Sequence, residues 1–498
     1  MTGRRVWVLV GVGLVVVSAL LLVWARTRPG YDPYGWLVWG YQTLHLSLDL
    51  GGAPSWKPLP FLFALLYALA GSFDLWLWMI TAVSISLAGC VFAGRIAYRV
   101  TREQPSDEKS LAPAAGYAPL VAAIFAGAAV LGVQDYMHYI LSVQSDPMIV
   151  TFCLAAIDMC LCRRYRWALA FAVLGSLGRP EVWPFLCLYT IWAWFKVPDM
   201  RLMLVGAVVL VAVMWFGIPW ITNGRPDVAG QLAMNTPPVL HNGQVGGTID
   251  QFATLQYLPV WMAALAAIVI GVRRGYRVVL ILAGGVVLWV GVESVFALHG
   301  FPVLPRFMFE AGAVGAVLAG IGIGLLVNEQ AILGGTLPRW SGVAVAVVLT
   351  LALVPGVMAR ISAEGPDLQK QRSRSEQIRL LQATIKTFGG YRAVRACGEP
   401  VTNVAYASAL AWLTHLDVGH VGYKPGREIR SGSPIVVFMP VSGGGWQVRP
   451  WHTPSAQRVS CSNLQASYLI TGRHPSGTLV YGRHPEINHG EGQPSRRG

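Results

Sequence analysis

The chain has 498 residues, of which 54% are hydrophobic and 12% are charged, whereas soluble domains contain about 25% charged residues. The net charge of +14 does not indicate nucleic-acid binding, because the arginines lie in loops between apolar stretches. Composition and charge therefore exclude an ordinary soluble enzyme and predict a protein that crosses a membrane many times.

Apolar stretches recur from the N-terminus to about residue 358, and about 20 apolar residues in a helix cross a bilayer. The first of them follows Arg4 and Arg5, and no small-residue cleavage site precedes the polar segment after it. We interpret it as a retained signal anchor. From about residue 359 the composition is that of a soluble domain, so the sequence predicts a transmembrane domain over 1–358 and a soluble domain over 359–498.

Six basic clusters orient the predicted spans, because positively charged residues favour the cytoplasmic side. The clusters are Arg4/Arg5, Arg95/Arg99/Arg102/Lys109, Arg163/Arg164/Arg166, Lys196/Arg201, Arg273/Arg274/Arg277 and Arg339. Placing all of them inside predicts about eleven spans, a cytoplasmic N-terminus and an extracytoplasmic C-terminal domain. The predicted spans are 5–25, 74–97, 117–134, 147–162, 167–178, 181–196, 202–222, 256–271, 277–297, 307–327 and 341–358.

Two long external loops follow from this orientation, over 26–73 and 223–254. The first contains an apolar segment, 58–71, that is short for a crossing and would turn Arg95 and Arg99 outward if it crossed. We therefore expect it to lie along the outer surface as an amphipathic interfacial helix. The second is rich in Gly, Pro, Asn and Gln, and loops of that length are usually functional.

Two residues of the first loop could carry chemistry. Asp32 lies just beyond the first span, where it could act as a general base or could cap a helix that starts near Tyr34. Lys57 precedes Pro58 at the start of the interfacial helix. It could hold a lipid phosphate or could extend to the headgroup layer as a surface lysine.

Further charged residues lie at predicted outer ends of spans. Asp146 could be a second active-site acid or a helix N-cap. Arg179 and Glu181 could neutralise each other in a structural pair or could take part in function. Arg306 could bind a phosphate or serve as a juxtamembrane anchor. Glu293 and His299 are weaker candidates.

The C-terminal segment predicts a small α/β domain, with a helix over 376–388 and strands over 434–439 and 467–470. Cys397 and Cys461 are its two cysteines, and in an exported domain such a pair forms a disulfide or, alternatively, two free buried thiols. No metal-binding spacing or nucleotide-binding motif is present in the sequence. No cofactor is therefore firmly implied, and a requirement for a divalent cation stays open.

The order of these features resembles the GT-C glycosyltransferase superfamily, and within it the branch of lipid-A aminoarabinose transferases and protein O-mannosyltransferases. In that branch an acidic motif follows the first span, a Lys-Pro-Pro segment opens a juxtamembrane helix, and the second span ends in Arg-rich sequence. Here 56–60, 71–73 and 95–99 are similar to that arrangement. Arg306, within Pro305-Arg306-Phe307, resembles a late Pro-Arg-Tyr/Phe motif of those relatives.

The chain departs from the common pattern at two points. Asp32 stands alone, followed by Pro33, where many relatives have an Asp-Glu pair. Leu59 separates the two prolines that are adjacent in relatives. These departures leave the sugar and the acceptor open.

The resemblance implies an inverting transfer of a sugar from a polyprenyl-phosphate donor to an extracytoplasmic lipid, glycan or protein acceptor. Asp32 would deprotonate the acceptor, and the cationic groups would stabilise the charge that develops on the leaving phosphate. Abundant Gly, Ala, Val and Arg with scarce Lys is typical of high-GC organisms, and in an actinobacterium mannosyl or arabinosyl donors would be expected. The residues implied are Asp32 and Asp146 as catalytic acids, Lys57, Arg179 and Arg306 for the phosphate, and Tyr34, Trp56 and Glu181 for substrate contacts.

Two other classes of protein compete with this interpretation. A transporter or flippase of lipid-linked precursors needs polar residues near the middle of spans. Asp158 comes nearest to that position, and it lies near a predicted cytoplasmic end. A non-catalytic envelope scaffold would use the C-terminal domain for binding and leave the external loops inert.

Overall fold

The computed structural model describes residues 3–52, 54–103, 116–234, 243–328, 340–441, 444–453, 455, 461, 468–473 and 479–483. The chain divides into two compact units, Met1–Arg372 and Ser373–Gly498. Lys109 and Arg339 of the predicted basic clusters, and Ser467 of a predicted strand, lie outside the described residues.

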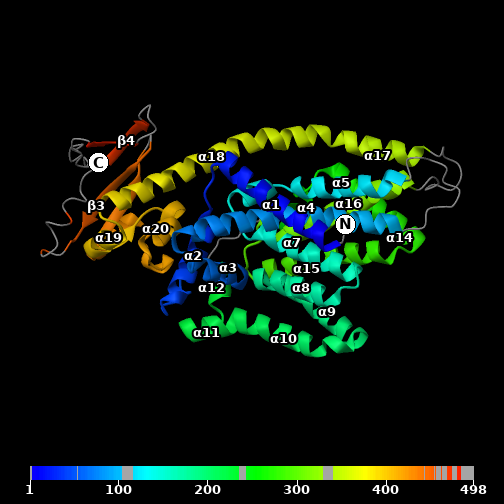
Figure 1. Ribbon diagram of the computed structural model, residues 1–498, viewed down its shortest axis with the longest axis horizontal. Helices are drawn as coiled ribbons and strands as arrows, with labels where there is room; N and C mark the ends of the chain where they lie inside the picture. Colours follow the sequence, from blue (N-terminus) through cyan, green and yellow to red (C-terminus); the bar gives the residue numbers. More distant parts are fainter. Residues whose placement is uncertain are drawn as a thin grey trace, which may run out of the picture. The chain divides into compact units, whose positions relative to one another are not determined.

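The first unit is helical (Figure 1). Its helices are α1 (Gly3–Ala25), α2 (Tyr31–Leu44), α3 (Pro58–Ala68), α4 (Asp74–Glu103), α5 (Ala118–Leu131), α6 (Tyr136–Leu141), α7 (Asp146–Leu161), α8 (Tyr165–Gly178), α9 (Trp183–Lys196), α10 (Arg201–Ala212), α11 (Ile218–Asn223), α12 (Val228–Met234), α13 (Gln244–Thr254), α14 (Leu258–Arg274), α15 (Arg277–Leu298), α16 (Phe309–Asn328), α17 (Ser341–Ala352) and the first part of α18 (Val354–Thr387). Short turns of helix join several of them: η1 (Gly71–Phe73), η3 (Pro180–Val182), η4 (Pro198–Met200), η5 (Val213–Gly217) and η6 (Pro305–Met308).

Each predicted span contains one helix or up to three consecutive helical segments. In the described residues, six helical stretches are long and apolar enough to cross a bilayer, and a seventh is added if α13 and α14, bent by 97°, count as one span. The remaining predicted spans are α5, α7, α8 and α9, which have 14 to 16 residues each. The polytopic α-helical membrane fold is therefore as predicted, although these four helices are short for a crossing.

Helix α16 is the central helix of the first unit and packs against α4, α5, α14 and α15 (Figure 1). In its most apolar stretch of 18 residues, 89% of the residues are buried, whereas in the corresponding stretch of α1 the share is 11%. Glycines allow the close packing, as small residues do between membrane helices. A Cβ atom at Gly320 would lie 2.6 Å from the carbonyl oxygen of Ala122 in α5, and one at Gly322 would overlap the carbonyl oxygen of Ala263 in α14.

The two predicted loops contain helices. In the first, α2 packs against α3, which is a helix within the predicted segment 58–71. Its position at the membrane surface stays a prediction. The prediction of a loop over 223–254 was wrong in part, because α12 and α13 lie within it. Gly243 is the N-cap of α13, and the helix packs against α15 with Thr248 fully buried. Packing thus outweighs the weak helix propensity of a Gly- and Thr-containing segment.

The second unit combines the end of α18 with short helices and one five-stranded sheet of order β1-β2-β3-β4-β5. Strands β1 and β2 are parallel and the other pairs are antiparallel. The elements are α19 (Tyr391–Cys397), β1 (Glu399–Val401), η7 (Val404–Tyr406), α20 (Ala407–Thr414), η8 (Val418–His420), α21 (Pro425–Ser431), β2 (Ile435–Pro440), β3 (Trp446–Trp451), β4 (Tyr468–Arg473) and β5 (Leu479–Arg483). A small α/β domain is therefore present, as predicted.

The second unit begins within a long helix and contains a disulfide. Helix α18 continues as a polar helix beyond residue 358, so the division falls between Arg372 and Ser373 instead of at the end of the apolar stretch. Within the unit, Cys397 and Cys461 form a disulfide with their Cα atoms 5.7 Å apart. The disulfide joins the end of α19 to the segment that follows β3.

Candidate active site

Five charged residues singled out in the sequence come together in the first unit. Asp32 lies in the first turn of α2, Lys57 is the N-cap of α3, and Asp146 begins α7. Arg179 is the C-cap of α8, and Arg306 lies in η6 just before α16. Two groups of ion pairs result, one partly exposed and one buried.

The partly exposed group is the pair of Asp32 and Arg306, whose Oδ2 and Nη1 atoms lie 3.7 Å apart. Their side chains are 19% and 22% exposed, so both can meet a ligand. The N-cap of α2 is Gly30, and no side chain caps the helix. The alternative that Asp32 is a helix cap is therefore wrong, and its carboxylate is available for other interactions.

The buried group is centred on Asp146, whose side chain is fully buried. Its Oδ1 atom accepts a hydrogen bond from Nη2 of Arg179 at 2.9 Å and lies 3.6 Å from Nζ of Lys57. Ser145, not Asp146, is the N-cap of α7, so the capping alternative is wrong here too. The Lys57 side chain is 17% exposed along its length, whereas its Nζ atom is buried beside Asp146.

The electrostatics of this group favour charged side chains. Burial alone would raise the pKa of Asp146, but Lys57, Arg306 and Arg179 together lower it well below its usual range. Burial lowers the pKa of Lys57, and the nearby Asp146 opposes that effect. Asp146 is therefore ionised at neutral pH, and Lys57 gives up its proton more readily than an exposed lysine.

Arg179 is surrounded by carboxylates. Its Nη1 atom donates to Oε1 of Glu181 at 3.0 Å and lies 4.0 Å from Oε1 of Glu293. Burial would lower the pKa of Arg179, but Glu181, Asp146 and two further acids raise it. The guanidinium thus serves as the buried counter-ion of several acids.

Glu310 is one of those acids, and sequence reasoning missed it. It lies in the first turn of α16 and is 2% exposed. Among the described residues, no side chain donates a hydrogen bond to either of its carboxylate oxygens. The available signal was a single acidic residue near the start of the predicted span 307–327, and ionisable residues within spans are usually functional.

Two aromatic rings that sequence reasoning also missed contact these arginines, and one of them connects the two groups. The ring of Phe307 lies 4.1 Å from the guanidinium carbon of Arg179 and 5.5 Å from that of Arg306. The ring of Tyr139 lies 5.7 Å from Arg306 on another side. Such contacts orient arginine side chains, and Phe307 is itself held by a 2.9 Å hydrogen bond from the Trp289 indole to its carbonyl.

Other predicted residues take no exposed position in this site. Tyr34 and Trp56 are completely buried, and the Trp56 indole donates to the carbonyl of Met214 at 2.9 Å. Both rings therefore pack in the interior, and a substrate contact by either of them stays a prediction. His299 is exposed after α15, where its Nδ1 atom lies 2.8 Å from the carbonyl oxygen of Val295.

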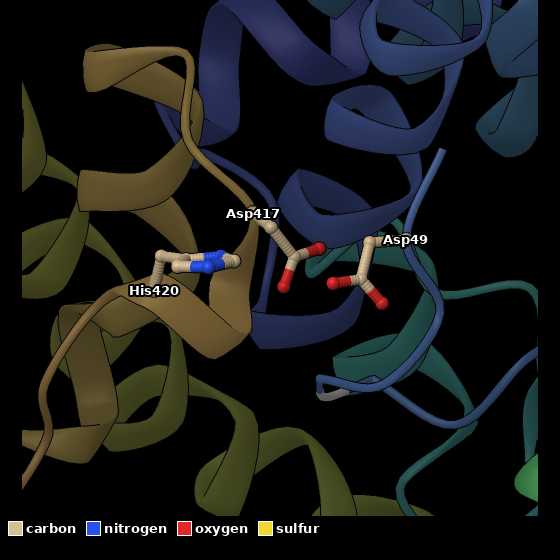
Figure 2. A group of neighbouring side chains, drawn as sticks. All are labelled: Asp49, Asp417 and His420. Atoms are coloured by element: carbon tan, nitrogen blue, oxygen red, sulfur yellow. The ribbon is translucent and has the colours of Figure 1, made fainter. Parts of the chain in front are cut away.

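Figure 2 shows Asp49 from the first unit with Asp417 and His420 from the second. In its own unit, Asp49 accepts hydrogen bonds from the Asn223 amide and from the backbone of Gly51, each at 2.7 Å. Asp417 caps η8 by accepting from the backbone of Gly419 at 2.6 Å. Each acid therefore has a structural role within its own unit.

Comparison with known proteins identifies a fold. No family model matches the chain, and no curated protein matches it. The crystal structure of ArnT from Cupriavidus metallidurans bound to undecaprenyl phosphate is 13% identical, and the match covers 94% of this chain and 96% of that one with a TM-score of 0.51. The apo structure of the same protein is 14% identical and gives a TM-score of 0.49 over 95% of this chain and 97% of that one. The chain therefore has an ArnT-like fold.

Proposed function

We propose that the protein is a membrane glycosyltransferase that moves a sugar from a polyprenyl-phosphate donor to an extracytoplasmic lipid, glycan or protein acceptor, with inversion at the anomeric carbon. The observation that carries the proposal is the pairing of a partly exposed carboxylate, Asp32, with a partly exposed guanidinium, Arg306. The fold supports it, because ArnT has been crystallised with undecaprenyl phosphate.

The proposed reaction begins when the donor phosphate binds Lys57 and Arg306. A phosphate competes with the Asp32 carboxylate for the Arg306 guanidinium, whose Nη1 atom is 3.7 Å from Asp32. Asp32 is then free to accept the proton of the acceptor hydroxyl. The acceptor oxygen bonds to the anomeric carbon as the bond from that carbon to the phosphate oxygen breaks. The two cations stabilise the negative charge left on the lipid phosphate.

Asp146 and Arg179 have a positioning role in this proposal. Both side chains are almost inaccessible, at 0% and 3% exposure, so neither meets the acceptor. Asp146 forms an ion pair with Lys57, and Arg179 forms ion pairs with Asp146 and Glu181. The prediction of Asp146 as a second catalytic acid thus becomes a proposal that it orients the lysine.

The decisive experiment compares Asp32→Asn with Asp227→Asn, an exposed acid paired with Arg225 at 3.9 Å. In membranes supplied with polyprenyl-phosphate sugars, Asp32→Asn should lose transfer by about 10²-fold or more, because the base is removed. It should still bind the donor, since Lys57 and Arg306 remain. Asp227→Asn should transfer normally. Full transfer by Asp32→Asn would show that Asp32 is not the general base.

The same assay separates the proposal from a flippase. A flippase would move the lipid-linked sugar without consuming it. The unaltered protein would then form no glycosylated product, and Asp32→Asn would give the same result. Polyprenyl-phosphate mannose and arabinose are the first donors to test, since the composition is typical of a high-GC organism.

A further inference from the structure

A cavity of about 400 Å³ lies at the end of the first unit opposite the candidate active site. It is formed by the turn between α7 and α8 and by the turn between α9 and α10, which lie close together (Figure 1). Helix α7 begins at Asp146 in the active site and ends beside the cavity, so its 16 residues separate the two by about 24 Å. The cavity volume is within the range of about 300–1,000 Å³ found for small-molecule sites.

The cavity is strongly positive. Arg163, Arg164 and Arg166 line it together with one acid, Asp199. All three arginines are exposed, and within the described residues none of them is in an ion pair. The arginines of α4 differ, because Arg95 and Arg99 both lie near the buried carboxylate of Asp158, at 3.1 and 3.8 Å. The preference of positively charged residues for the cytoplasmic side explains arginines at this end of the helices. It does not explain why they line a cavity.

Aromatic residues around the cavity are of the kind found at the depth of lipid headgroups. Tyr165 lines it, and its ring is 5.1 Å from that of Trp192 in a T-shaped contact. The Tyr189 hydroxyl donates to the carbonyl of Tyr165 at 2.7 Å. Trp167, also in the lining, is 61% exposed. Tyr and Trp gather in this way where a membrane meets water.

An apolar surface leads away from the cavity along α9. Leu188, Ile191 and Phe195 are spaced on one helical face and are 56%, 59% and 72% exposed. A lipid whose headgroup lay in the cavity could therefore lay its acyl chains against this face.

We propose that this cavity binds the headgroup of an anionic phospholipid from the predicted cytoplasmic leaflet. The three guanidinium groups would donate hydrogen bonds to the phosphodiester oxygens, and Asp199 would accept one from a headgroup hydroxyl. Basic pockets between membrane helices on this side bind such headgroups. The site shares no residue with the proposed glycosyltransferase centre, so either proposal can fail without the other.

Native mass spectrometry of the full-length protein, purified and exchanged into phosphatidylglycerol or phosphatidylcholine, provides the test. The informative variant is Arg163→Ser/Arg164→Ser/Arg166→Ser. The matched control is Arg273→Ser/Arg274→Ser/Arg277→Ser, which removes the same charge from the turn between α14 and α15. Melting temperatures of both variants establish that they are folded.

The unaltered protein should retain phosphatidylglycerol and not phosphatidylcholine, and the cavity variant should bind it at least about tenfold more weakly. The control should bind it normally. Equal loss in both variants would mean general surface attraction and would overturn the proposal. So would equal retention of phosphatidylcholine, or displacement of the lipid by millimolar glycerol phosphate, which would indicate a soluble phosphate ligand.

Discussion

Lys57 is a cation whose charge depends on its surroundings, and this makes it testable by pH. Its pKa is lowered by burial, so the ammonium is lost as the pH rises through a value below the usual 10.5. Because kcat/KM reports ionisations of the free enzyme, we expect it to fall on the alkaline side about tenfold per pH unit. In Lys57→Arg the decline should move to higher pH, since a guanidinium stays charged.

The control for this measurement is Lys196→Arg, at the other end of the helices, which should leave the alkaline limb in place. If Lys57→Arg had the same limb as the unaltered enzyme, another group would be responsible for it.

Arg179 is a second residue whose replacement has a defined consequence. Arg179→Met leaves Glu181 and Glu293 buried without this counter-ion and leaves Asp146 with Lys57 alone. Breaking a buried ion pair on one side costs roughly 3–5 kcal/mol. We expect a clear fall in the melting temperature of the purified protein. Arg225→Met, which breaks a pair at 63% and 60% exposure, should change stability by less than about 1 kcal/mol. Similar melting temperatures for the two variants would contradict the role given to Arg179.

The sequence indicates well which charged residues belong to the candidate site, and poorly which side chains contact them. Asp32, Lys57 and Arg306 were identifiable because charges are rare in this chain and lie at predicted span ends. Phe307 was not identifiable, because one apolar residue among many carries no mark of the two arginines it contacts. The burial of Tyr34 and Trp56 was not predictable either, because aromatic residues suit both interfaces and cores.

Among the elements, α16 has the least room for change. Gly322→Leu would drive a side chain into the backbone of α14, and overpacking of a dense core costs about 1–3 kcal/mol or more. We expect less folded protein by fluorescence-detected size-exclusion chromatography. Gly291→Leu in α15, where nothing lies within 4 Å, should behave normally. Equal yields would mean that α14 and α16 separate easily.

Hydropathy predicted the positions of the helices because each apolar stretch must satisfy its own backbone hydrogen bonds in lipid. It predicted α12 and α13 poorly, since their stability depends on contacts with distant segments such as α15. It also could not separate the polar part of α18 from a linker, because a helix can continue after its apolar residues end.

For the second unit as a whole, the disulfide is expected to be a main source of stability. Without reductant, iodoacetamide should modify five of the seven cysteines of the denatured protein, and all seven after reduction. Cys397→Ser/Cys461→Ser should destabilise the unit by about 2–4 kcal/mol, because the bridge closes a loop of 64 residues. Cys187→Ser, at an exposed free thiol, should have no such effect. Modification of all seven without reductant would exclude the bridge.

The orientation of the whole molecule is also testable by cysteine labelling in a cysteine-free background. A membrane-impermeant maleimide added outside should reach Ser72→Cys, before α4, and should miss Arg166→Cys, beside the basic cavity. Labelling of both from outside would reverse the assignment of that cavity to the cytoplasmic side.

The contrast between α16 and the helices around it has a consequence for how such chains diverge. In the most apolar stretch of α1 only 11% of the residues are buried. Such a helix needs little more than side chains that are soluble in lipid, and many residue types meet that need. A helix in which that share is 89%, with glycines against neighbouring backbones, accepts few alternatives. Most of the surface of the first unit is therefore free to drift, while a small set of positions keeps the helices in place. Very different sequences can then hold the same fold, as in the match over 94% of the chain at 13% identity.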